Sequence, residues 1–301
     1  MLGTMLKRLL LDAMDLRDID TSYAPDRELF EKLDAAACIF TREVKVLHTE
    51  AEITSVANQQ NYDLPGGFIG LHLVNRSGKF FLKYYDGENY SFPTLTTWDK
   101  IYRDNLSTAQ TWPNRFALIE KEDLGTLITG TATAAGALSG GQCTLTDTTK
   151  LFTTTNRVWP RDIIYNVTTG AVGYVLSVTD ATHLVVALFD TDGAAEALSL
   201  SDSYRIQPAS KYQILLDAPS ESSGDTMYVP YTCMPEPVFS DQGFWRFGPE
   251  TCKAIVDGAA SLMKVSKREY REASQLGGLF GQELSRKRLE IAQQALRGKG
   301  N

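Results

Sequence analysis

The sequence predicts an α+β protein with helices at both ends of the chain and antiparallel β structure between them. Apolar residues recur at helical spacing near each end, whereas they alternate with a period of two through the middle. One stretch of the middle is poor in charged residues, which indicates a small all-β module inserted into a larger β domain. We expect the N- and C-terminal helices to pack together. The predicted regions are N-terminal helices at 1–43, the β domain at 44–124 and 209–248, the inserted module at 125–208, and C-terminal helices with a basic tail at 249–301.

Two helices are expected near the N-terminus. In the first, apolar residues alternate between spacings of four and three, which places them on one helical face: Leu2, Leu6, Leu9, Ala13 and Leu16. The second begins at Pro25-Asp26, because proline suits the first turn of a helix. Its apolar positions keep the same spacing: Leu29, Leu33, Ala36 and Phe40. Neither helix alone buries enough surface to be stable, so both must pack on other elements.

The β domain shows short alternating runs separated by tight turns. The runs cover 44–48, 69–73, 80–84, 213–216 and 227–231. Asp86-Gly87 is a hairpin signal directly after the third run. Short strands joined by such turns favour antiparallel pairing over parallel strands linked by helices.

The predicted insert at 125–208 has eleven charged residues in its 84, fewer than the 22% of the whole chain would give. Its strand-like runs cover 162–165, 173–178, 183–188 and 203–206. Turns at Thr169-Gly170 and at 190–193 separate them. The glycine-rich stretch at 136–141 is expected to be a loop, because it lacks the Lys-Ser/Thr of a phosphate-binding loop.

Helical spacing returns after Pro249. Cys252, Ile255, Ala259 and Leu262 share one face. Three glycines at 277, 278 and 281 are expected to break or hinge this part of the chain, since each costs about 1 kcal/mol inside a helix. A final helix is predicted from 282 to about 296.

The C-terminal segment is basic on an otherwise acidic chain. From Lys264 onward, nine Lys and Arg against four Glu give a net charge of +5, which leaves −12 on the rest of a chain whose total is −7. A solvated helical face is one interpretation of this pattern. The other is docking onto an acidic surface of a partner, for which the candidate residues are Lys264, Lys267, Arg268, Arg271, Arg286, Lys287, Arg288, Arg297 and Lys299.

The sequence contains no recognisable catalytic or cofactor motif. The four cysteines are scattered, and the histidines at 48, 72 and 183 lack metal-ligand spacing. The carboxylate pairs Asp86/Glu88 and 190/192 lie in turn sequences, where such residues favour turn geometry. We therefore expect no enzyme activity, no cofactor and no metal. No run of about 18 apolar residues is present, so no membrane span is expected.

Five stretches, the last two taken together, carry a resemblance to known proteins. They are ITSVANQQNYDLP at 53–65, DAPSESSGDTMYVPY at 217–231, PETCKAIVDGAA at 249–260, and VWPRDIIYNVTTG at 158–170 together with SDSYRI at 201–206. The first three resemble the head-to-tail adaptor (connector) proteins of tailed bacteriophages, which include the tail tubular protein A group. The last two are similar to a small β module of phage structural proteins.

This resemblance implies a structural virion protein at the head–tail interface, assembled in the host bacterial cytoplasm. It implies a homo-oligomeric, dodecameric ring under the portal protein, with the region 249–301 reaching into the portal. The region 44–237 would face tail, nozzle or tail-fibre proteins. DNA would pass through the lumen without specific binding during genome ejection. Family members often lack the insert, so the resemblance implies no role for 125–208.

Two alternatives remain. One is another phage tail or baseplate protein, whose β module binds host glycan through Trp98 or Trp112, since exposed aromatic residues can bind sugars or protein partners. Packing roles for these residues and Tyr102 are equally compatible with the sequence. The other alternative is a glycan hydrolase, which would need two carboxylates within about 10 Å in a concave pocket.

Overall fold

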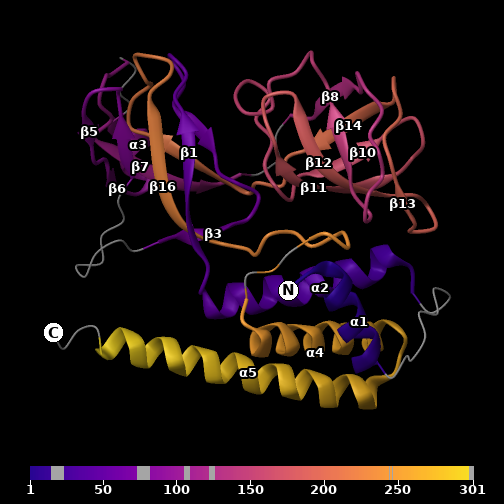
Figure 1. Ribbon diagram of the computed structural model, residues 1–301. Coiled ribbons are helices and arrows are strands. Elements are labelled where there is room, and N and C mark those ends of the chain that lie inside the picture. Colours follow the sequence, from indigo (N-terminus) through magenta and orange to yellow (C-terminus); the bar gives the residue numbers. More distant parts are fainter. Residues whose placement is uncertain are drawn as a thin grey trace. The chain divides into compact units, whose positions relative to one another are not determined.

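The computed structural model describes residues 1–14, 24–72, 82–104, 109–121, 126–243, 245 and 247–297, with the backbone alone for 294–297. The chain forms two compact units (Figure 1), each built from separate stretches of sequence. Unit 1 comprises Met1–Lys45, Ile128–Ile206 and Met234–Asn301, and unit 2 comprises Val46–Leu127 and Gln207–Cys233. The predicted α+β class is confirmed, with helices from both chain ends and antiparallel sheets from the middle. None of the helices seen in the described residues has the length and apolar character that a bilayer crossing requires.

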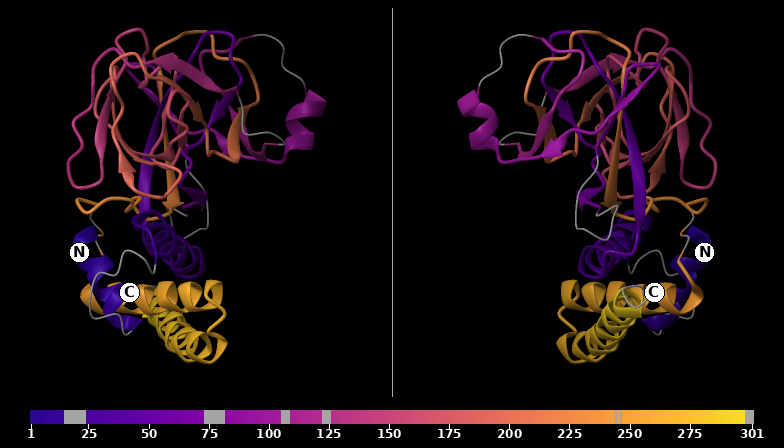
Figure 2. Two further views of the ribbon diagram at one scale, coloured as in Figure 1. Left: turned by 90° about the vertical axis from the view of Figure 1, so that its right-hand side faces the viewer. Right: turned by 90° about the vertical axis from the view of Figure 1, so that its left-hand side faces the viewer.

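Four helices form one layer of unit 1. They are α1 (Gly3–Ala13), α2 (Asp26–Val44), α4 (Pro249–Ser266) and α5 (Tyr270–Arg297). Helix α4 contacts the other three, and Figure 2 shows all four lying together. The prediction that N- and C-terminal helices pack together is therefore confirmed. The predicted apolar face of α2 is also confirmed, since Leu29, Leu33, Ala36 and Phe40 are all buried.

Helix α1 is rotated relative to the face that its sequence predicted. Leu2 is 47% exposed, whereas the buried positions are Gly3, Leu6, Leu10 and Leu11. The backbone around Ser240 passes so close to Gly3 that a Cβ there would lie 2.0 Å from the Ser240 carbonyl oxygen. The Gly3 N–H also donates to the Gly243 carbonyl at 2.7 Å. This backbone contact sets the rotation of the helix.

The predicted glycine break in the C-terminal region is wrong. Helix α5 runs without interruption through all three glycines. The actual break lies between α4 and α5, where Arg268 has a φ of 67°. Packing explains the continuity: a Cβ at Gly258 of α4 would lie 2.9 Å from the Phe280 ring, and one at Gly277 would lie 3.1 Å from the Ser261 hydroxyl. Small residues let the two helices approach closely, and this contact offsets the low helix propensity of glycine.

The described strands of unit 1 form one seven-stranded sheet. Its strands are β8 (Ile128–Thr131), β9 (Cys143–Thr146), β10 (Ile163–Asn166), β11 (Val172–Val178), β12 (His183–Phe189), β13 (Ala195–Glu196) and β14 (Ser203–Gln207). The order is β13-β12-β11-β10-β14-β8, with β9 pairing β12. The four runs predicted at 162–165, 173–178, 183–188 and 203–206 are thus strands. Gly170 and Gly193 adopt positive φ at the predicted turns. A closed cluster of buried side chains, including Leu145, Phe152 and Val186, forms the core.

A nearly buried ion pair joins this β module to the helical layer of unit 1. The Arg161 guanidinium donates to both carboxylate oxygens of Asp34 on α2, at 2.8 and 2.7 Å, and also to the Pro235 carbonyl. Each side chain of the pair is 11% exposed. Nearby, Tyr174 of β11 stacks on Phe239 with ring centroids 4.0 Å apart. The ion pair holds the module on α2, and the ring contact joins it to the segment that precedes α4.

Unit 2 contains two sheets. The first has order β1-β16-β4-β5, with β3 also pairing β16. Its strands are β1 (His48–Thr54), β3 (Phe68–Leu71), β4 (Lys83–Tyr85), β5 (Tyr90–Ser91) and β16 (Thr226–Cys233). The predicted hairpin at Asp86-Gly87 joins β4 to β5, with Gly87 at a φ of 99°. The predicted run at 44–48 is largely wrong, because α2 continues to Val44 and β1 starts only at His48. Leu73 and Phe80 lie outside the described residues.

The second sheet has order β2-β15-β7-β6, and helix α3 (Trp98–Asp104) contacts β7. Its strands are β2 (Asn61–Asp63), β6 (Thr94–Leu95), β7 (Arg115–Glu120) and β15 (Tyr212–Leu216). The β6–β7 pair is parallel, which departs from the antiparallel pairing predicted for the β domain. The other strands of this sheet pair antiparallel.

Candidate functional site

The basic residues predicted to contact a partner fall into two groups on the C-terminal helices. Lys264, Lys267, Arg268 and Arg271 surround the break between α4 and α5, and the other described ones are Arg286, Lys287 and Arg288. At 1.5 Å per residue, roughly 24 Å of helix separates the start of α5 from the second group. The side chain of Arg297 and all of Lys299 lie outside the described residues. The structure therefore presents two charged regions, not one.

Two lysines of the first group are engaged within the chain. The Lys264 side chain is 10% exposed, and its Nζ lies 2.5 Å from Glu269 and 2.7 Å from Glu272. The hydrogen bond that Lys264 donates to Glu272 lowers the pKa of that glutamate. Lys267 lies 3.5 Å from Glu28 of α2. Lys264 is therefore placed to stabilise the α4–α5 connection, and little of its side chain is exposed.

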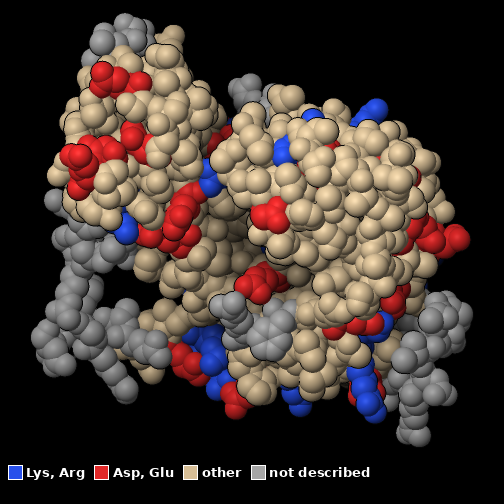
Figure 3. All heavy atoms as spheres, turned by 45° about the horizontal axis from the view of Figure 1, so that its top comes forward, with Lys and Arg blue, Asp and Glu red and all other residues tan. Residues whose placement is uncertain are grey.

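The second group is also paired with carboxylates. Arg286 contacts Glu250 at 3.0 Å, Glu283 at 2.7 Å and Glu290 at 3.3 Å. Lys287 contacts Glu290 at 2.9 Å, and this hydrogen bond is the main cause of the lowered pKa of that glutamate. Arg288 contacts Glu43 of α2. Figure 3 shows basic and acidic side chains next to one another on the helices. These surface pairs contribute little stability, but they neutralise much of the charge predicted to face a partner.

Arg268 and Arg271 differ from the other basic residues. Both are exposed, and neither forms an ion pair with any residue that the structure describes. They lie beside exposed apolar residues at the same turn, Val265 (48%) and Tyr270 (64%). Further along, α5 exposes a stripe on the side away from α4, here called the outer face of α5: Arg271, Gly278, Gln282, Ser285 and Leu289. Among the described residues, Arg268 and Arg271 are thus the exposed members of the predicted set that form no ion pair.

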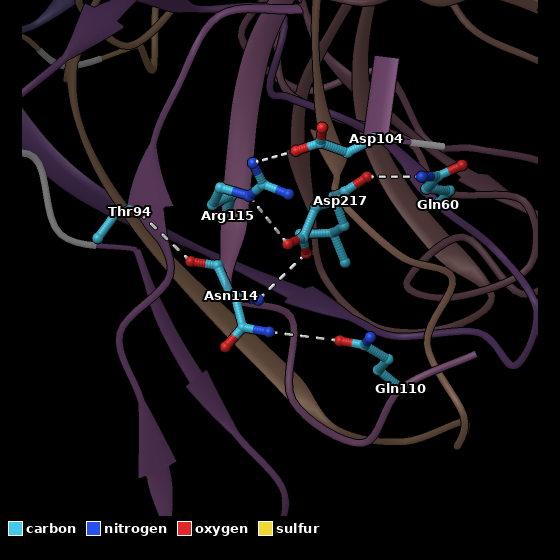
Figure 4. A network of polar contacts seen from close by, with 8 residues as sticks. Gln60, Thr94, Asp104, Gln110, Asn114, Arg115 and Asp217 are labelled. Carbon is cyan, nitrogen blue, oxygen red and sulfur yellow. Dashed lines mark hydrogen bonds and ion pairs between the residues drawn. The ribbon is translucent and has the colours of Figure 1, made fainter. Parts of the chain in front are cut away.

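A polar network in unit 2 holds the end of helix α3 in place (Figure 4). Arg115 of β7 contacts Asp104 of α3 at 2.5 Å and Asp217 at 3.4 Å. The hydrogen bond to Asp104 is the main cause of the raised pKa of Arg115. Asp217 is buried, and it also accepts the backbone N–H of Asn114 at 3.1 Å. One arginine therefore ties α3 to β7 and to the residue that follows β15.

An open cleft of about 770 Å³ lies between α3 and the second sheet of unit 2. Its lining residues are Gln60, Asn61, Trp98, Ile101, Tyr102, Ile119, Glu120, Lys121, Gln213 and Leu215. The aromatic residues singled out from the sequence therefore divide: Trp98 and Tyr102 line the cleft, whereas Trp112 is half-buried elsewhere. The sequence did not reveal the polar lining, because its residues come from three strands far apart in the chain.

The carboxylates and cysteines considered as candidate site residues either stabilise turns or lie apart from one another. The Asp86 carboxylate accepts the backbone N–H groups of Asn89 and Glu88, which lowers its pKa, and Asp190 accepts those of Asp192 and Ala194. Among the described residues, no cluster of three or more His, Cys, Asp and Glu could hold a metal ion. All four cysteines lie in the described part and form no disulfide.

The structure brings two histidines together that are distant in the sequence. The His48 and His72 rings in unit 2 lie with centroids 3.8 Å apart. Partial burial, followed by the proximity of His72, lowers the pKa of His48. His183, in unit 1, instead lies 2.8 Å from Asp180. The His48–His72 contact could not be predicted from helical or strand periodicity, because the contact depends on where β1 and β3 pair with β16.

The sequence matches no protein-family model, and none of the curated proteins compared with it is similar to it.

Proposed function

We propose that the chain is a structural, non-enzymatic adaptor of a tailed-phage particle, which forms a dodecameric ring between the portal and the tail. The observation that carries the proposal is the helical layer of unit 1. Both chain ends contribute to it, and its longest helix leaves one face exposed. The resemblance described above assigns this end of the chain to the portal.

The outer face of α5 and the exposed residues next to it have properties that suit docking on another protein. A Cβ added at Gly278 or Gly281 would meet nothing within 4 Å, so a partner can approach the helix backbone closely. Leu279 and Leu289 are 53% and 63% exposed. Arg268 and Arg271 supply cations without a carboxylate partner in the described part of the chain. Each contact is weak, but repetition around a ring multiplies them through avidity.

The charge distribution fits a conduit for DNA. The chain before Lys264 carries a net charge of −12. Acidic walls deny contacts to the phosphates of the duplex, so DNA can slide without specific binding. In this proposal the β structure contacts tail, nozzle or tail-fibre proteins, and the ring lies in the virion at the head–tail interface.

Binding to purified portal protein tests the proposal. Electron microscopy of the mixture should show a twelve-fold ring seated on the portal. The double variant Arg268→Glu/Arg271→Glu should bind at least about tenfold more weakly, with the largest difference at low salt. Arg286→Gln is the matched control, because this arginine already contacts three carboxylates of its own chain.

Two results would contradict the proposal. A mixture in which no ring forms on the portal removes the adaptor assignment. Rings that form equally well with the double variant would remove the role of the α4–α5 turn in docking. Circular dichroism of both variants establishes that they are folded, which is expected since the substituted side chains are exposed.

A further inference from the structure

The cleft in unit 2 has a floor and a wall of different chemistry. Strand register places Leu215 opposite Asn61, and Gln213 between Asp63 and Ile119. These residues share one face of the second sheet because side chains alternate along a strand. The opposite face, which carries Tyr62, Ile214, Leu216 and Phe116, is buried. The floor of the cleft is therefore the one side of this sheet that α3 leaves partly uncovered.

Helix α3 forms an aromatic wall. Ile101 is buried and faces the sheet, whereas Trp98 and Tyr102, one turn apart, are 48% and 69% exposed. Their rings stack with centroids 5.0 Å apart and an interplanar angle of 19°. Figure 2 shows α3 projecting at the edge of unit 2. The Arg115 network fixes the end of this helix. The two aromatic side chains thus keep much of their surface exposed to solvent although their rings stack on one another.

The polar lining is rich in amides and low in net charge. Within the described residues, the side-chain amides of Asn61 and Gln213 have no hydrogen-bond partner. Lys121 is held by Asp63 at 2.9 Å, and Glu120 is the one acidic residue of the described lining. Amides can both donate and accept, as sugar hydroxyls do. A lining of this kind has neither the cations that a nucleic acid needs nor a wholly apolar surface.

We propose that this cleft binds a neutral, pyranose-containing glycan. The apolar C–H face of one sugar ring packs on the Trp98–Tyr102 wall, and its hydroxyls hydrogen-bond to the Asn61 and Gln213 amides. A volume of about 770 Å³ is within the size range of small-ligand sites and accommodates a short oligosaccharide. The proposal does not depend on the adaptor function, because the cleft lies in unit 2 whereas the residues proposed to dock on the portal lie in unit 1.

Titration of the full chain with three neutral disaccharides tests the site: lactose, cellobiose and N,N′-diacetylchitobiose. Intrinsic tryptophan fluorescence and saturation-transfer NMR report binding. At least one of the sugars should bind at millimolar concentration. Trp98→Ala should weaken its binding by about tenfold or more, because the main stacking surface is lost. Gln213→Leu should weaken it by several-fold, whereas the matched control Trp112→Ala should leave it unchanged.

Three outcomes would overturn the proposal. The first is that none of the disaccharides binds the wild-type chain. The second is that Trp98→Ala, shown by circular dichroism to be folded, binds the sugar as well as the wild type does. The third is that a decaproline peptide binds the cleft more tightly than every sugar, with the same loss in Trp98→Ala, since aromatic grooves also recognise extended proline-rich segments. That result would identify a protein partner as the occupant.

Discussion

Replacing Asp34 by alanine would leave the Arg161 guanidinium without its carboxylate in the contact between the β module and the helical layer of unit 1. The two side chains are each 11% exposed and share two hydrogen bonds of 2.8 and 2.7 Å. Burial alone would lower the pKa of Arg161, but Asp34 more than offsets this effect and raises it. Because the guanidinium of arginine is not deprotonated in proteins, Arg161 stays charged when its partner is removed.

The expected cost follows from this geometry. Removing one member of a buried ion pair typically destabilises a protein by about 3–5 kcal/mol, because the other charge remains buried and unpaired. The hydrogen bonds that Arg161 donates to the Pro235 carbonyl remain and place the value towards the lower end of that range. The double variant Asp34→Leu/Arg161→Met leaves no unpaired charge and should be less destabilised than Asp34→Ala.

Urea unfolding followed by circular dichroism measures the free energy of unfolding of the wild type, of Asp34→Ala, of the single variants Asp34→Leu and Arg161→Met, and of the double variant. A double-mutant cycle then isolates the coupling between the two residues. Lys83→Met is a suitable control, since its ion pair with Glu50 is exposed and should contribute no more than about 1 kcal/mol. A cost below about 1 kcal/mol for Asp34→Ala, or additive single substitutions, would refute the reasoning.

Three further predictions concern other parts of the molecule. Gly278→Ala should raise the free energy of unfolding by up to about 1 kcal/mol, since a Cβ there meets nothing within 4 Å. Gly258→Ala should lower the free energy of unfolding, because its Cβ would displace the Phe280 ring. Thermal unfolding of the two variants distinguishes these effects. The lowered pKa of His48 means that the unfolded chain binds its proton more readily, so stability should fall as pH drops below about 6.5, and His72→Gln should reduce that dependence in urea unfolding at several pH values. Arg115→Met should increase protease cleavage near α3 without unfolding the rest of unit 2, because it releases the contact to the end of that helix; unchanged digestion would contradict this role.

Local signals allowed much of the secondary structure to be predicted. In α2, apolar spacing after Pro25 identifies the face that the structure buries. Glycine at positions 87, 170 and 193 marks turns whose positive φ favours that residue. Four strands of the inserted module were recognised as strand-like runs separated by turns. These features depend on residues close together in the chain, so the sequence by itself determined this helix, these turns and these strands.

Contacts between distant segments decided the rest. The rotation of α1 depends on the backbone of 240–243, and the continuity of α5 depends on its packing against Gly258 and Ser261. The basic segment that the sequence presents as a run of positive charge is divided by tertiary structure into paired residues and the exposed Arg268 and Arg271. The cleft beside Trp98 is assembled from three strands and a helix. Periodicity and composition describe each segment alone. Close packing and Coulomb interactions act between groups that folding brings together, so only the tertiary structure decided the helix rotation, the ion pairs and the cleft.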